Sequence, residues 1–357
     1  MHILEATAAY EAWAGKRIDF VADDLRLKHR RMAEAAFLFM RATFYSWVGL
    51  WRETCPELAA APRILAVGDL HLENFGTWRD AEGRLAWGVN DFDEAFPMPY
   101  AIDLVRLATS ALLAIREESL AIDADDAAAA ILAGYTQGIA GGATPFVLEE
   151  SHPGLRAMAL GAERDPQRFW SRMTAFKPAT PPPSVRLFLQ DALPDSAEPM
   201  RILHRIAGLG SLGRPRYVAL AQSDGGLVAR EAKAMLPSAY AWALRLPMNR
   251  LYYDAIVARA LRPPDPFLRV RKGWLLRRLG PHCSRIELDH FPKQRDERYI
   301  LTAMGQETAN VHLGSPAAIA AIRRDLKRRG KAWLKLAAER MAEATIAEWK
   351  LWRKSAR

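Results

Sequence analysis

Two short acidic segments lie close together in the sequence, and they constrain the fold of this chain more than any other feature. The first, GDLHLEN, spans residues 68–74, and the second, NDFD, spans residues 90–93. One strand is expected to lead into the first segment, and a second strand, from Arg84 to Val89, follows a turn and leads into the second. These strands are expected to form a hairpin-like unit with carboxylates at its ends. An Asp or Asn beside a turn commonly caps that turn, but two such loops so close together indicate a functional cluster.

The residue types in these segments suit the transfer of a phosphoryl group. That reaction needs a carboxylate that orients the attacking hydroxyl and accepts its proton, and oxygen ligands that hold Mg²⁺ against nucleotide phosphates. Asp69 supplies the carboxylate, and Asn74 and Asp91 supply two oxygen ligands. Two protein ligands suffice because Mg²⁺ keeps waters or phosphate oxygens in its coordination shell. The spacing from Asp69 to Asn74 equals that between the base and the metal ligand in the protein-kinase catalytic loop.

At this point the sequence resembles a known family. The two acidic segments and PYAIDL, at residues 99–104, resemble the Gly-Asp-Leu-His-x-x-Asn and Ile-Asp-Phe/Trp segments of aminoglycoside and choline kinases. The wider match includes RMAEAAFLFMRAT and GLGSLGRPRYVAL, resembles the uncharacterised domain of unknown function family 2252, and runs from about residue 25 to residue 315. The likeness implies the same roles for Asp69, Asn74 and Asp91. It adds Asp103 as an anchor for the catalytic loop.

Two positions depart from the pattern of the kinases. The usual His before Gly-Asp is Val67 here, and the residue two after Asp91 is Asp93 instead of Gly. Asp93 is therefore an additional candidate metal ligand, or it changes the geometry of the loop. His71 is shared with the small-molecule kinases, and we expect it to hold the loop by hydrogen bonding rather than to titrate in catalysis.

A glycine-rich loop, GLGSLG at residues 208–213, is the candidate phosphate-binding loop. A strand-like segment follows it, which favours a kinase-type loop between two strands over a dinucleotide-binding fold, where a helix follows directly. Gly208, Gly210, Ser211 and Gly213 are the candidate residues, and a plain glycine-rich turn is the alternative.

A cation for the phosphates is expected on the next strand, which contains Arg230 and Lys233. The likeness aligns Arg230 with the family's lysine, and Lys233 lies three residues later. Side chains three apart project to opposite sides of a strand, so both stay candidates. The sequence does not assign the acid that normally pairs with such a lysine.

The order of these parts is unusual, because in ordinary kinases the glycine loop precedes the catalytic loop. The residues before Asp69 are expected to be helical, because apolar residues recur at helical spacing over 20–51. Near the other end of the chain, MGQETANVH at 304–312 resembles the helix just before the catalytic loop of small-molecule kinases. We therefore expect an α+β, two-lobed, protein-kinase-like fold of the aminoglycoside phosphotransferase type, circularly permuted and with a mostly helical larger lobe. The expected parts are a helical catalytic lobe at 1–183 that ends in a proline-rich linker, a β-rich nucleotide-binding lobe at 184–295, and helices returning to the helical lobe at 296–357.

The chain of 357 residues carries a net charge of +9, which is concentrated near its C-terminus. Twelve Lys or Arg and four Asp or Glu after residue 322 give that segment a net charge of +8. It is either a solvated helical face or a weak nucleic-acid contact. Two cysteines exclude a disulfide framework and a cysteine-rich zinc site. The sequence shows neither a membrane-spanning stretch nor a signal peptide, so a cytoplasmic protein is expected.

These features predict a phosphotransferase that uses ATP and Mg²⁺ and acts on a small-molecule hydroxyl or amine. Residues 143–176, with His152, Arg164, Phe169 and Trp170, are the expected acceptor wall. Three alternatives stay open. They are a transferase of AMP, a metal-dependent phosphoesterase, and a non-catalytic nucleotide- or nucleic-acid-binding protein in which Arg230 marks a degenerate phosphate site.

Overall fold

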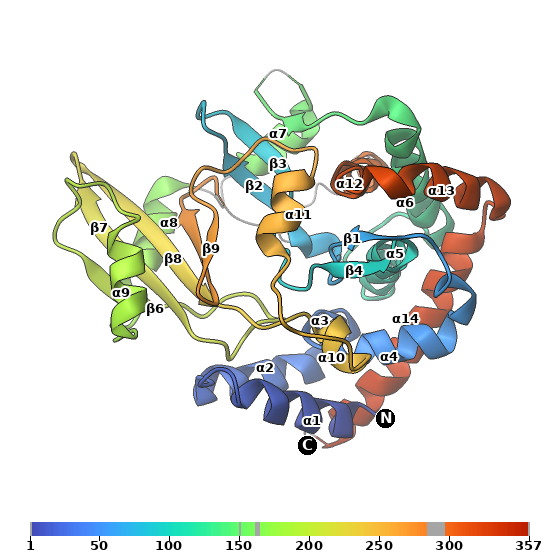
Figure 1. Cartoon of the computed structure of the whole chain (residues 1–357), viewed down its shortest axis with the longest axis horizontal. Helices are drawn as coiled ribbons and strands as arrows, with labels where there is room; N and C mark the ends of the chain where they lie inside the picture. Colours follow the sequence, from blue (N-terminus) through green and yellow to red (C-terminus); the bar gives the residue numbers. More distant parts are fainter. Residues whose placement is uncertain (1, 150, 161–164, 284–296, 356–357) are drawn as a thin grey trace.

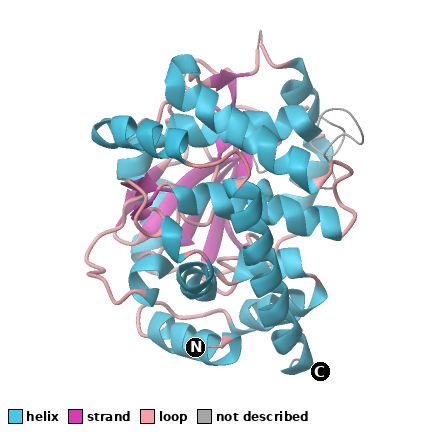
Figure 2. Cartoon of the chain, turned by 90° about the vertical axis from the view of Figure 1, so that its right-hand side faces the viewer, coloured by secondary structure: helices cyan, strands magenta, loops and turns pink. Residues whose placement is uncertain are grey.

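The computed structural model describes residues 2–149, 151–160, 165–283 and 297–355. The chain is a mixed α/β structure with small antiparallel sheets, and nearly half of it is helical. A β-rich part built on one sheet lies beside a larger, mainly helical part that holds both ends of the chain (Figure 1). Viewed from the helical side, the strands lie behind a layer of helices (Figure 2).

The β-rich part is a five-stranded antiparallel sheet in the order β6–β7–β8–β10–β9. Its strands are β6 (Arg201–His204), β7 (Arg216–Ser223), β8 (Gly226–Ala234), β9 (Arg269–Arg271) and β10 (Trp274–Leu279). Helix α8 (Pro166–Thr174) packs on one face through Phe169 and Met173, and α9 (Pro183–Gln190) packs on the other through Val185 and Leu189. Because side chains alternate along a strand, each face of β8 meets a different environment.

The proline-rich segment expected as a linker, residues 177–183, differs from that expectation. The backbone N–H of His204 donates to the carbonyl of Lys177 (2.8 Å), and that of Ala179 donates to the carbonyl of Ile202 (3.0 Å). This segment is therefore paired along the edge of the sheet, and its last proline begins α9. Since α8 also packs on the sheet, association with the sheet begins before the expected boundary at 183. The boundary expected between 295 and 296 lies outside the described residues.

The helical part is assembled from both ends of the chain. Its first six helices are α1 (Ile3–Gly15), α2 (Ala22–Glu34), α3 (Ala36–Ala42), α4 (Phe44–Thr54), α5 (Ala101–Arg116) and α6 (Ala124–Gln137). The C-terminal end adds α12 (Glu297–His312), α13 (Pro316–Arg328) and α14 (Trp333–Ser355). Helix α12 packs along α6, and α14 crosses α5, α4 and α2. Three further α-helices are short, namely α7 (Pro153–Ala159), α10 (Ala239–Ala243) and α11 (Tyr253–Arg259).

Several helix boundaries differ from the periodicity of the sequence. The helix expected over 20–51 is three helices, interrupted at Ala35, which has extended dihedral angles, and at Thr43. The apolar spacing continues across both breaks, which is why the sequence pattern does not reveal them. Asp123 is the N-cap of α6, because its carboxylate accepts the backbone N–H of Asp126 at 2.7 Å.

Two small sheets carry the acidic segments, and their pairing corrects the expected hairpin. Strand β1 (Arg63–Ala66) pairs with β4 (Phe96–Pro99), whereas β2 (Phe75–Arg79) forms the hairpin with β3 (Leu85–Val89). The other edge of β3 pairs with β5 (Phe146–Val147). The first acidic segment thus connects β1 to β2, and the second connects β3 to β4. Because β1 pairs with β4 and β2 pairs with β3, the two loops lie side by side between the two sheets.

The basic C-terminal helix α14 is a packing element of the helical part. Its buried face includes Leu334, Ala338, Met341 and Trp352. In the ranges that the structure describes, no helix combines the length and apolar character needed to cross a membrane.

Candidate active site

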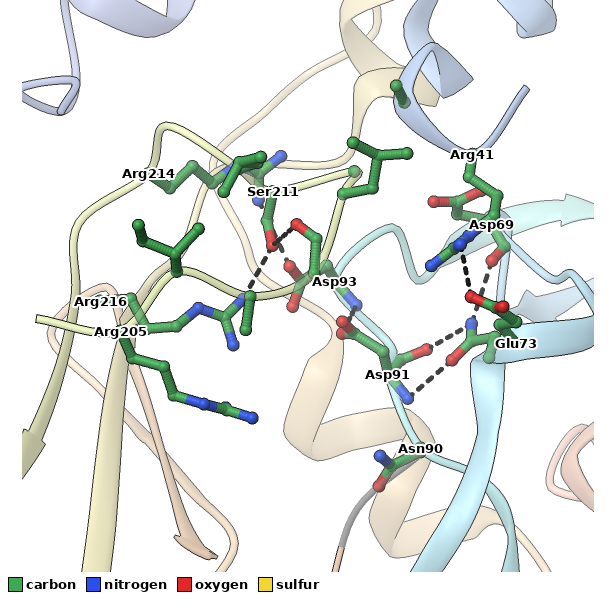
Figure 3. A pocket seen from close by; sticks show the side chains of 18 of the residues that line it. Arg41, Asp69, Glu73, Asn90, Asp91, Asp93, Arg205, Ser211, Arg214 and Arg216 are labelled. Atoms are coloured by element: carbon green, nitrogen blue, oxygen red, sulfur yellow. Dashed lines mark hydrogen bonds and ion pairs between the residues drawn. The ribbon is translucent and has the colours of Figure 1, made fainter. Parts of the chain in front are cut away.

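Both acidic loops and the glycine loop line one pocket of about 650 Å³ between the helical part and the sheet. The predicted site residues among its lining are Asp69, His71, Asn74, Asp91, Asp93, Gly208, Gly210 and Ser211. Figure 3 shows Asp91 and Asp93 in the middle, with Asp69 on one side and Ser211 and Arg216 on the other. Residues far apart in the sequence therefore converge on a single space.

Asp69 is oriented by a buried arginine of α5. Arg106 donates to Oδ1 of Asp69 from Nε (2.8 Å) and from Nη2 (2.5 Å). The guanidinium is fully buried and lies over the rings of Phe44 and Trp47. Both hydrogen bonds go to Oδ1, and Oδ2 lies on the side of Gly210. Burial raises the pKa of Asp69, and the charge of Arg106 opposes that rise.

Asp103 lies directly beneath the loop that carries Asp69. Its carboxylate accepts the backbone N–H groups of Val67 and Gly68, both at 2.8 Å, and lies 2.9 Å from Nε2 of His312. The hydroxyl of Tyr135 lies 2.8 Å from the other ring nitrogen of His312. All these side chains are buried. Asp103 is thus placed as the loop anchor that the resemblance implies, and a histidine of α12 completes the arrangement.

Asn74 ties the two acidic loops together. Its Nδ2 donates to the backbone carbonyls of Asp69 and Asp91, both at 3.0 Å, and its Oδ1 accepts the backbone N–H of Asp91 at 2.9 Å. An amide oxygen has a second lone pair. The position of Asn74 is therefore a brace, and its role as a metal ligand stays a prediction.

Lys233 of β8 joins the sheet to the acidic loops. Its ammonium lies 3.0 Å from Oδ2 of Asp91 and 2.6 Å from Oδ2 of Asp93, and the side chain is 1% exposed. Burial alone would raise the pKa of Asp91, but the charge of Lys233 lowers it below the usual range. Burial and the neighbouring Asp91 charge raise the pKa of Asp93 to about 6. One cation thus holds two carboxylates together.

Arg230 lies on the opposite side of β8, away from the pocket. Its Nε donates to the carbonyl of Ala192 (2.9 Å), and its guanidinium lies over the ring of Phe267. Of the two candidate cations, the structure therefore brings Lys233 to the acidic loops and not Arg230. The alternation of side chains along a strand is the physical reason.

The glycine loop packs closely against the loop that carries Asp69. A Cβ atom on Gly210 would lie 3.0 Å from the carbonyl of Arg41 and 3.3 Å from Oδ2 of Asp69. The carbonyl of Gly210 accepts a hydrogen bond from Nζ of Lys28 at 3.1 Å. Gly208 and Gly213 have positive φ angles of +72° and +97°, which favour glycine. The loop therefore depends on glycine for both its turns and its close approach.

The sequence did not reveal the arginines of the pocket. Arg41 of α3 pairs with Glu73, and Arg214 lies 3.4 Å from Asp93 and 3.5 Å from Glu94. A usable signal was present for Arg106, which stands within the most apolar stretch of the chain. A lone arginine in such a stretch is rarely buried without a partner.

The residues named for the expected acceptor wall at 143–176 lie in different places. Phe169 of α8 lines the pocket, and it does so from the sheet side. Trp170 packs beside it, and His152 instead lies 3.1 Å from the hydroxyl of Tyr299. Arg164 lies outside the described residues.

Residues 20–168 match the model of a family described as "Uncharacterized protein conserved in bacteria (DUF2252)". That match contains both acidic segments and ends before the five-stranded sheet. No curated protein and no solved structure gives a significant match. The chain is thus similar to this uncharacterised bacterial family over residues 20–168.

Proposed function

We propose that this protein is an ATP- and Mg²⁺-dependent phosphotransferase that acts on a small-molecule hydroxyl or amine. One observation carries the proposal. Asp69 and the Asp91–Asp93 pair line a single pocket against a glycine-rich loop. Lys233 pairs with both Asp91 and Asp93, although it is 142 residues from Asp91 in the sequence. Phosphoryl transfer is catalysed mainly by positioning and by charge stabilisation, and this set of groups supplies both.

Asp69 is the proposed general base. Arg106 occupies Oδ1 and fixes the carboxylate, so Oδ2 is the oxygen that would accept the proton of the acceptor hydroxyl. A carboxylate with a raised pKa is a better base than an exposed one, because efficient proton transfer needs a pKa near the working pH. Asp103 supports this role by fixing the backbone just before Asp69.

Asp91, Asp93 and Asn74 are the residues that would hold Mg²⁺. Oδ1 of Asp93 is buried and makes no hydrogen bond within the described part of the chain, and a buried carboxylate oxygen of this kind suits a cation. In the described ranges no three or more His, Cys, Asp or Glu side chains are grouped to hold a metal ion. Mg²⁺ takes most of its ligands from water and phosphate, so few protein oxygens suffice to hold it. When bound, Mg²⁺ would neutralise charge on the transferred group.

The kinase-like, circularly permuted relationship belongs to this proposal as well. It is supported by α12, which comes late in the chain yet packs against β1 and places His312 on the anchor of the catalytic loop. It is also supported by the glycine loop, which lies between two antiparallel strands, β6 and β7.

The proposal is tested by calorimetric titration of the full chain with ATP, with and without Mg²⁺. Mg²⁺-dependent binding is expected in the wild type and in Asp195→Asn, an exposed control position, and is expected to be lost in Asp91→Asn. Saturation at about 100 times the dissociation constant should stabilise the fold by about 2.7 kcal/mol in thermal unfolding.

Asp69→Asn completes the test, because it should bind ATP and transfer nothing in an acceptor screen. Mass analysis of the product separates transfer of phosphate from transfer of AMP. A folded wild-type protein that binds no nucleotide with any divalent metal would overturn the proposal.

A further inference from the structure

Three arginines on the sheet side of the pocket share one buried carboxylate. Glu231 of β8 is fully buried, and it accepts hydrogen bonds from Nη1 of Arg216 (2.9 Å) and from Nε of Arg277 (2.7 Å). It also pairs with Arg205, which follows β6. Cross-strand pairing explains this geometry, because Arg277 lies directly opposite Glu231 in the β8–β10 ladder. All three guanidinium groups line the pocket.

The charges of this cluster do not balance. Three guanidinium groups contact one carboxylate, so the cluster itself has two more positive than negative charges, on a wall where Arg216 is 4% exposed and Arg205 and Arg277 are each 17% exposed. Despite burial, the charge of Asp91, which also pairs with Lys233, joins Glu231 in raising the pKa of Arg277. Burial lowers the pKa of Arg205 to about 10 despite the opposing charge of Glu231, and the charges of Arg277 and Arg216 add to that lowering. Buried positive charge of this kind is stabilised by an anionic ligand.

The cluster also lies at a defined place relative to the proposed chemistry. Glu231 and Lys233 project from the same face of β8, so the arginines continue the row that begins with the Lys233–Asp91 ion pair. Asp91 and Asp93 lie between Asp69 on one side and Arg205 and Arg216 on the other (Figure 3). A donor whose reacting phosphate faces Asp69 would therefore extend its other phosphates toward the arginines.

The lining next to the cluster is apolar. Leu279 follows Arg277 by two residues on the same face of β10, and Phe169 and Met173 of α8 pack against it. These three side chains and Phe176 line the same pocket. A polyphosphate held by the arginines would thus carry a flat apolar group, such as a nucleobase, into this region.

We propose that Arg205, Arg216 and Arg277 form a wall that binds the non-reacting phosphates of the donor, and that Glu231 is the positioning residue that holds the three guanidinium groups side by side. Planar guanidinium groups bind phosphate oxygens in pairs, which a lysine cannot do. The donor class is then a nucleotide with a polyphosphate chain rather than a simple acyl phosphate. This inference rests on the proposed function, and its test can be separated from the test of that function.

The experiment titrates the full chain with inorganic tripolyphosphate in EDTA, because this probe needs neither Asp69 nor a metal. Arg277→Gln and Arg205→Gln should each weaken binding by about tenfold or more, since each removes a charge-assisted contact. Arg278→Gln is the matched control. Arg278 neighbours Arg277 on β10 but projects to the other face, where it donates to the carbonyl of Arg79. Thermal unfolding identifies any variant that does not fold, and two variants on different elements keep the test decisive.

The possible outcomes are distinct. If Arg278→Gln and Arg277→Gln lose tripolyphosphate affinity equally, the binding is a general charge attraction to a basic protein, and the proposed arginine site is wrong. Unchanged nucleotide affinity in folded Arg277→Gln and Arg205→Gln, with phosphoryl transfer intact in the wild type, would also overturn it and leave the proposed function standing. If tripolyphosphate binding depends on the arginines but no phosphoryl group is transferred to any acceptor, the arginine site is supported and the proposed phosphotransferase activity is not.

Discussion

Asp69 and Arg106 form an ion pair whose two members differ in exposure. The arginine is fully buried, whereas the aspartate side chain is 20% exposed toward the pocket. Removing the aspartate therefore leaves a buried guanidinium without its counter-charge, and an unpaired buried charge lowers stability strongly. This asymmetry decides which substitution of Asp69 is useful as a catalytic control.

Asp69→Asn should lose less stability than Asp69→Leu, because the amide removes the opposing charge but keeps an oxygen that accepts from Arg106. Asp69→Leu should lose about 3–5 kcal/mol of unfolding free energy, since Arg106 then has neither the charge nor the acceptor. Urea denaturation of the two variants measures the difference. Equal stability of Asp69→Asn and Asp69→Leu would contradict the importance of the pair.

Lys28 gives a prediction about pH. Burial lowers the pKa of Lys28 to about 8, partly against the attraction of Glu11, from an ordinary value of 10.5. Below pH 8 the folded protein therefore carries a disfavoured buried charge, and above pH 10.5 the group is neutral in both states. The unfolded chain binds more protons between these values, so stability gains from Lys28 as the pH rises through this window.

We expect the unfolding free energy of the wild type relative to Lys28→Met to rise by about 3 kcal/mol from pH 8 to pH 10.5. Denaturant unfolding at several pH values measures this difference, and the variant cancels the titration of all other groups. A difference that is constant across the window would show that Lys28 is not buried as described.

At the scale of elements, strand faces were predictable and strand partners were not. The alternation along β8 shows from sequence alone that Arg230 and Lys233 project to opposite sides. Which side meets the acidic loops depends on contacts across 142 residues, and no local pattern contains that information. The same limit explains β1, which pairs with β4 instead of forming the expected hairpin. His312 reaches Asp103 across 209 residues and was equally hidden.

The local part of the site was more accessible. The spacing of Asp69 and Asn74 and the position of the glycine loop between two strands follow from short motifs, and the structure brings these residues to one pocket. The arginine cluster around Glu231 was missed because cross-strand pairing creates it. Short motifs therefore located the acidic loops, and sheet register determined what faces them.

Gly210→Ala tests whether the close approach of the glycine loop matters. Its Cβ atom would press on the carbonyl of Arg41 and on Asp69 and would displace the loop by a few tenths of an ångström or more. Small displacements at a reacting centre are costly, so turnover should fall by about tenfold to a hundredfold while the melting temperature changes little.

The matched control is Gly226→Ala, at the start of β8, where a Cβ atom meets nothing closer than 3.9 Å. Steady-state kinetics and thermal unfolding of both variants give the comparison. Full turnover in Gly210→Ala would show that the loop is not positioned against Asp69 during the reaction.

At the scale of the whole molecule, the two ends of the chain build one helical part. The indole N–H of Trp352 in α14 donates to the carbonyl of His29 in α2, at 3.2 Å. Helix α14 also packs against α5, which carries Asp103 and Arg106. The basic C-terminal segment thus supports the elements behind the site, which favours a solvated helical face over a separate binding tail.

Deleting residues 333–357 and reducing the positive charge of the C-terminal segment should therefore have different effects. The deletion should abolish the cooperative unfolding transition, because it exposes buried side chains such as Leu334 and Met341 to water. The triple variant Lys327→Gln, Lys350→Gln, Lys354→Gln changes exposed positions only, and it should keep its unfolding free energy within about 1 kcal/mol of the wild type. It should also keep full ATP affinity. If the triple variant instead loses a steeply salt-dependent binding to RNA or DNA that the wild type shows, these cations serve a nucleic-acid partner, because each lost phosphate contact lowers the salt dependence by about one unit of slope.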